Sequence, residues 1–143
     1  MQLIKVFNLN ESTEASKVER DVVIMIDKFT IKAKFTQKPI STVLSWLKEH
    51  GYRWNSEKRE WWQRIEVGEV LTEEEKKEAI EASKTQDVLK MFELLTAEKE
   101  REKALARVEI ETLVHELMQM LQNNNITKII IIDTTRETIE VWG

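Results

Sequence analysis

The order of hydrophobic and polar residues predicts two halves of different structure. In the first half, apolar residues follow the two-residue period that is typical of β-strands. The segments 1–7, 22–26 and 28–35 are therefore expected to be strands. In the third of these, apolar residues alternate with a row that includes Lys32 and Lys34, so one face of the strand is apolar and the other is cationic.

A helix and a hairpin are expected to follow these strands. Apolar residues recur at helical spacing in 40–47, after Pro39, which suits a first helical turn, and before Gly51, which suits a helix end. The segment 52–65 is then expected to form a β-hairpin with a polar turn. Residues 1–68 are thus predicted to form a first domain, a small antiparallel sheet with one packed helix.

The second half is predicted to be mainly helical. Residues 72–75, Thr-Glu-Glu-Glu, have the pattern of a capping box and open a helix. Between 85 and 122 there is neither Gly nor Pro, and apolar residues recur every three or four positions. The wholly charged run 98–103 leaves open whether this is one long helix or two. The segments 128–133 and 138–142 are expected to form a terminal hairpin.

The apolar stripe of the second half is longer than the small first domain could cover, which predicts a partner helix. A hairpin that follows a long helix also needs a sheet edge or another subunit to shelter it. We therefore expect an α+β fold in which residues 69–143 form a helical oligomerisation region. Its long C-terminal helices and its terminal β-hairpin are expected to build a homodimer or homotetramer.

The amino-acid composition limits the kinds of site and the cellular location that are expected for this chain. The chain has no cysteine, which excludes disulfides and thiolate metal sites. No apolar run approaches the ~20 residues of a membrane span, and no signal-peptide pattern is present, so we expect a cytoplasmic protein with no membrane partner. Abundant Glu and Lys together with rare Gly and Pro are typical of thermophiles.

Charge and aromatic residues gather in the same part of the chain. Residues 1–66 carry a net charge of +3 and residues 67–143 carry −7, while 28–64 alone holds 9 basic and 3 acidic residues. That stretch also holds 7 of the 10 aromatic residues and 4 of the 5 tryptophans. Aromatic rings stack on unpaired bases and neighbouring Lys and Arg contact phosphates, so this coincidence predicts binding of single-stranded nucleic acid.

The layout resembles the ThermoDBP family, the single-stranded DNA-binding proteins of hyperthermophilic archaea, over essentially the whole chain. The resemblance implies sequence-independent binding of single-stranded DNA in a cleft or tunnel of the N-terminal domains of an oligomer. RNA is a second candidate ligand. The residues implied in binding are aromatic or basic: Lys32, Lys34, Trp46, Tyr52, Arg53, Trp54, Lys58, Arg59, Trp61, Trp62 and Arg64.

Other interpretations of the same residues stay open. Tryptophan and arginine are also favoured at protein interfaces, so the chain could be a non-enzymatic adaptor that uses its long helix and a Trp/Arg patch. Large aromatic side chains are also often part of a core. Because Trp61 and Trp62 are consecutive in a strand, they point to opposite faces. Trp62 shares its face with Arg64 and is the better candidate for stacking, and Trp61 is the better candidate for the core.

Catalysis has little support in the sequence. His115-Glu116 begins like a zinc-protease motif, but Gln119 stands where that motif has its second histidine. Asp133 ends a strand, where nucleases sometimes place a metal-binding carboxylate, yet no second acid is well placed beside it. We therefore expect a protein that is not an enzyme, with no metal, no cofactor and no small-molecule substrate.

Overall fold

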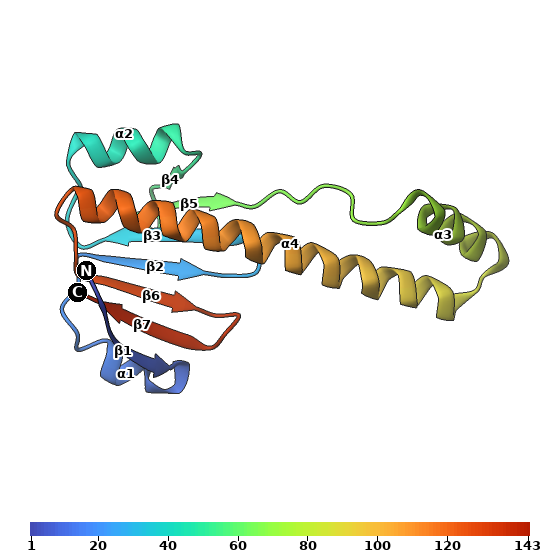
Figure 1. The fold of residues 1–143 in the computed structure, drawn as a ribbon, viewed down its shortest axis with the longest axis horizontal. Helices are drawn as coiled ribbons and strands as arrows, with labels where there is room; N and C mark the ends of the chain where they lie inside the picture. Colours follow the sequence, from blue (N-terminus) through green and yellow to red (C-terminus); the bar gives the residue numbers. More distant parts are fainter.

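The computed structural model describes all of residues 1–143, and the α+β class is confirmed (Figure 1). A single sheet contains seven strands: β1 (Leu3–Asn8), β2 (Val22–Ile26), β3 (Thr30–Phe35), β4 (Arg53–Asn55), β5 (Glu60–Arg64), β6 (Ile129–Asp133) and β7 (Thr138–Trp142). The helices are α1 (Ser12–Ala15), α2 (Ser41–Glu49), α3 (Glu73–Thr85) and α4 (Val88–Asn123), and the 3-10 turn η1 (Leu9–Glu11) precedes α1. No helix combines the length and the apolar composition that crossing a membrane requires.

The strand order is β1-β7-β6-β2-β3-β5-β4. Neighbouring strands are antiparallel except β2 and β6, which are parallel with Val22 opposite Ile129. At the β1 edge, the backbones of Gln2 and Gly143 exchange two hydrogen bonds of 2.9 and 3.0 Å. The terminal hairpin therefore completes the same sheet as the N-terminal strands.

This topology corrects the expected division of the chain at residues 68 and 69. Residues 129–142 pair with β2 and β1, so the sheet is mixed and is built from both halves of the sequence. The physical reason lies in the apolar run 129–132, which suits a central strand that is covered on both faces. The shelter that this hairpin needs is thus supplied within one chain and does not require another subunit.

Helices cover the two faces of the sheet unequally. On one face, α2 and the second half of α4 pack against alternate residues of the central strands, with Ile24, Ile31, Leu47 and Leu117 fully buried. On the other face, α1 covers a small apolar cluster over β1, β7 and β6. The side chains of β3, β5 and β4 on that second face have no helix over them, and this is where the candidate site lies.

α4 is continuous through the charged run, which settles the question that the sequence left open. At 1.5 Å per residue its 36 residues span about 54 Å. Its second half lies on the sheet, and its first half extends beyond the sheet beside α3 (Figure 1). We call α3 together with residues 88–103 the arm.

The base of the arm is fastened by charged side chains. The predicted capping box is present: the Thr72 hydroxyl accepts from the Glu75 N–H at 3.1 Å, and the Glu75 carboxylate accepts from the Thr72 N–H at 3.0 Å. Arg101 donates to both carboxylate oxygens of Glu75, at 2.6 and 2.9 Å. These bonds lower the pKa of Glu75 to about 2, chiefly through the hydrogen bond from Arg101. The charged run of α4 therefore helps to hold α3 against α4 through Arg101.

Candidate nucleic-acid interface

A tryptophan lies between two cations on the uncovered face of the sheet. Strand register places Lys32 of β3 and Arg53 of β4 directly opposite Trp62 of β5, one on each side. Residues that are directly opposite share a face, and so do alternate residues of a strand, so Lys34 and Arg64 extend the same surface. Trp62 is partly exposed, and the Arg53 guanidinium lies 5.9 Å from its ring centroid. We call these five residues the platform.

The platform keeps most of its positive charge available. Of its four cations, only Lys32 lies within 4.0 Å of an acid: its ammonium is 3.8 Å from the Glu60 carboxylate. That separation is too long for a strong ion pair. The Arg64 guanidinium lies over the Phe29 ring at 5.7 Å, which positions the side chain without neutralising it. The cations can therefore contact an anionic ligand.

Register also reveals a platform neighbour that sequence reasoning missed. Met25 of β2 lies opposite Lys32, so Met25, Lys32, Trp62 and Arg53 form one row across four adjacent strands. The Met25 side chain is exposed although its strand reads as wholly apolar. The position of Met25 follows from its pairing with β3, and the pattern of residues within β2 alone does not report that pairing.

Three further candidates from the sequence lie on the opposite face, at the edge of the sheet. Trp54 and Trp61 are cross-strand partners whose ring centroids are 5.4 Å apart, and Trp54 is 52% exposed. They border a groove of about 710 Å³ that lies between the β4–β5 hairpin on one side and residues 35–39 and α2 on the other. Arg59 also lines it, together with Lys38 and Lys48, which sequence reasoning did not select. We call this the edge groove.

Two aromatic candidates are corrected by their burial. Tyr52 is 4% exposed and Trp61 is 6% exposed, and both belong to the main core beneath α2. Burial raises the pKa of Tyr52 to about 12. Neither ring presents a face to solvent on which a base could stack. Tyr52, which the resemblance implied in binding, is therefore a core residue, and Trp61 contributes to the edge groove only as part of its wall.

The last two candidates lie at the margins of these surfaces. Trp46 on α2 is partly buried and stacks on His50, with centroids 3.9 Å apart and planes 15° apart. One face of its ring is thus already occupied. Lys58 is exposed in the β4–β5 turn, between the platform and the edge groove, where its N–H donates to Asn55 Oδ1 at 3.1 Å.

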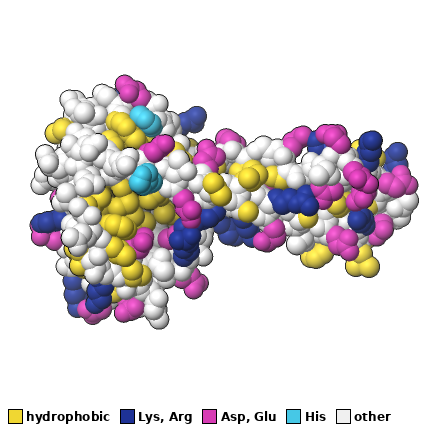
Figure 2. All heavy atoms as spheres, viewed as in Figure 1, with side chains coloured by type: hydrophobic (Ala, Val, Ile, Leu, Met, Phe, Trp, Pro, Cys, Tyr) yellow, Lys and Arg dark blue, Asp and Glu magenta, His cyan; other side chains and the backbone are white.

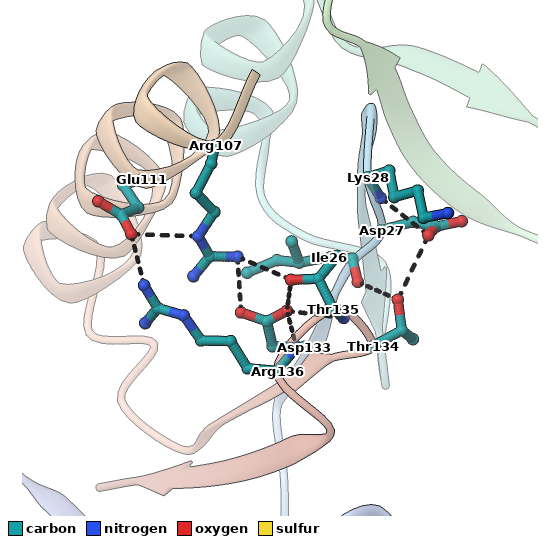
Figure 3. Close-up of polar contacts among 9 residues, drawn as sticks. All are labelled: Ile26, Asp27, Lys28, Arg107, Glu111, Asp133, Thr134, Thr135 and Arg136. Atoms are coloured by element: carbon teal, nitrogen blue, oxygen red, sulfur yellow. Dashed lines mark hydrogen bonds and ion pairs between the residues drawn. The ribbon is translucent and has the colours of Figure 1, made fainter. Parts of the chain in front are cut away.

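Asp133 is engaged within the protein (Figure 3). Its carboxylate is 4% exposed and lies 2.8 Å from the Arg107 guanidinium. The other oxygen accepts from the Thr135 hydroxyl at 2.6 Å and from the Arg136 N–H at 3.2 Å, while Glu111 bridges Arg107 and Arg136. No group of three or more His, Asp or Glu residues is placed to hold a metal ion. This geometry fastens α4 to the β6–β7 turn.

Comparison with protein-family models, with curated proteins and with solved structures found no match for this chain. The fold and its surfaces define an α+β protein with an uncovered cationic sheet face, an edge groove and a projecting helical arm. Function is therefore inferred from the chemistry of these surfaces.

Proposed function

We propose that this protein binds single-stranded DNA on the platform, in the cytoplasm and independently of sequence. The observation that carries the proposal is the cross-strand row in which Trp62 lies between Lys32 and Arg53. A base can stack on the indole while the flanking cations contact the phosphates on either side of it. Single-stranded binding is also what the resemblance to the ThermoDBP family implies.

The chemistry of the platform favours single strands over duplex. In a duplex the bases are paired and stacked on one another, so their faces are not available to Trp62. Every base has an aromatic face, so stacking of this kind tolerates any sequence. RNA offers the same bases and phosphates, and sheet faces with exposed aromatic side chains are used to bind it in other folds.

The test is a tryptophan-fluorescence titration with oligo-dT of about 25 nucleotides, with a duplex of equal length and with oligo-rU as comparisons. We expect quenching by the single strands and none by the duplex. With four platform cations and about 0.7 released counterions per contacted phosphate, the slope of log K against log salt should be about −3. Absence of any response to the single strands would sink the proposal.

We further propose that the protein is a homo-oligomer whose subunits meet at the arm. Val88, Leu89, Met91 and Phe92 are exposed near the start of α4, and Leu89 is the most exposed, at 79%. Such a group of large apolar side chains marks an interaction surface. Figure 2 shows acidic and basic side chains interspersed around the arm. Both signs of charge suit pairing with an identical surface, because an interface between two copies related by a two-fold axis must complement itself.

Disrupting this apolar surface should give monomers. We expect the wild-type chain to elute with at least twice its 16.9 kDa mass in light scattering, and Leu89→Glu with Phe92→Glu to elute at 16.9 kDa. Lys99→Glu, an exposed arm position outside the apolar group, is the matched control and should stay oligomeric. A monomeric wild type would contradict self-association. It would favour the adaptor alternative, in which the arm contacts a different protein.

A further inference from the structure

We propose that the edge groove is a second nucleotide site, and that one DNA strand passes from the platform around the β4–β5 turn into it. This inference rests on the proposed function and extends it to the opposite face of the sheet. The ligand of the groove is one unpaired nucleotide, with its base against Trp54 and its phosphate near the cations at the rim.

The chemistry of the groove fits that ligand. Its volume of about 710 Å³ lies within the range of sites that hold small organic ligands. Apolar side chains form its walls and cations are its only charged residues: Leu44, Trp54 and Trp61 on one hand, and Lys38, Lys48 and Arg59 on the other. A site with an exposed indole and three cations, lined by no acid, complements an aromatic base attached to a phosphate.

The route between the two surfaces is short. β4 is the edge strand of the sheet and has three residues, so the hairpin that separates the platform from the groove is narrow. Adjacent strands in a sheet are only about 4.8 Å apart. Lys58 is exposed in the β4–β5 turn, and Arg53 lies on the platform side of β4. Cations therefore line the path of a strand that wraps around the hairpin.

The backbone conformation of Arg59 allows this groove cation to be removed by a glycine substitution that has a matched control. Arg59 has φ of 52°, in the left-handed region that favours glycine. Glu137 has φ of 56° at the corresponding position of the β6–β7 turn, and a side chain at the start of each turn, Asn55 or Asp133, accepts backbone N–H bonds in the same way. Arg59→Gly and Glu137→Gly should relieve the same strain, but only the first removes a cation from the groove.

The experiment compares two lengths of labelled oligo-dT by fluorescence anisotropy. A strand of about 5 nucleotides is meant to cover the platform alone, and one of about 15 nucleotides is long enough to reach the groove as well. We expect Trp54→Leu and Arg59→Gly to bind the longer strand about tenfold more weakly than wild type, and the shorter strand equally well. Glu137→Gly should bind both strands as wild type does, and thermal melting should show all three variants folded.

The outcomes separate the two proposals. If Trp54→Leu and Arg59→Gly bind the longer strand with wild-type affinity, the groove is not a nucleotide site, while the platform proposal stands. If both variants weaken the two lengths equally, the strand does not follow the path around the turn. If the wild type binds neither oligonucleotide, the platform proposal fails, and the groove proposal fails with it.

Discussion

Replacing Trp62 with alanine is expected to remove most of the affinity for single-stranded DNA while the fold stays intact. Loss of one stacked base costs about 1–3 kcal/mol, which is roughly a 5- to 150-fold increase in Kd. The change should leave stability nearly unaffected, because Trp62 lies on the part of the sheet face over β3, β5 and β4 that no helix covers. Anisotropy with labelled oligo-dT measures the affinity, and urea denaturation measures the free energy of unfolding.

The preceding residue is the matched control. Trp61→Ala removes an equal side chain from the buried face of the same strand, where Trp61 packs in the core beneath α2. We expect this change to lower the free energy of unfolding by about 3–5 kcal/mol. At temperatures where the variant remains folded, its affinity for the strand of about 5 nucleotides, which covers the platform alone, should change far less than that of Trp62→Ala. If Trp62→Ala binds like wild type, base stacking on the platform is refuted.

Removing the Asp133 carboxylate should have the largest effect on stability outside the apolar core. Asp133→Ala leaves the Arg107 guanidinium without its buried partner and takes an acceptor from the β6–β7 turn. The side chain of Arg107 is 25% exposed, so water offsets part of the loss. We therefore expect a decrease of roughly 3 kcal/mol in the free energy of unfolding, at the lower end of the range for broken buried pairs. Urea denaturation near neutral pH measures it.

The same carboxylate predicts a dependence on pH. Burial works to raise the pKa of Asp133, but hydrogen bonds from Thr135 and Arg107 and the charge of Arg107 outweigh it, so the folded-state pKa is lowered. The contribution of Asp133 to the free energy of unfolding is therefore complete above the pKa of an aspartate in the unfolded chain, about 4. It is lost as the pH falls through the lower pKa of Asp133 in the folded protein. Asp133→Asn keeps an oxygen for the turn and removes the charge. It should lose less stability than the alanine variant and show a weaker pH dependence; equal acid sensitivity in the wild type and Asp133→Asn would refute this role.

Local signals in the sequence were sufficient for most elements of this fold, although not for the short η1 and α1. The β-branched run 22–26 became β2, the alternation in 28–35 became β3, and Thr72 and Glu75 form the expected capping box. The pairing of the strands was harder to predict from the sequence. No local pattern reports that β6 joins β2 in parallel, because the two segments are distant in the chain and their pairing depends on tertiary packing.

For the candidate site too, local patterns predicted some features, and the others depend on tertiary packing. Strand periodicity correctly separated Trp61 from Trp62, because consecutive residues must face opposite sides. It could not show which side of the sheet a helix would cover, and this decides that Tyr52 is buried. Nor could it show that Trp54 is exposed at the sheet edge, or that Lys38 and Lys48 border the same groove.

The parallel pairing of β2 with β6 has a consequence for how the chain folds. The hydrogen bond from the Thr134 hydroxyl to the Ile26 carbonyl joins residues 108 positions apart, so the centre of the sheet depends on contacts of high sequence separation. Closing a long loop costs entropy before any of these contacts is gained. The helical hairpin in the intervening segment relies on near neighbours and can form early. We therefore expect sheet closure to be the slow step and folding to be slower than that of a helical bundle of equal length, because pairings between distant segments lower folding rates.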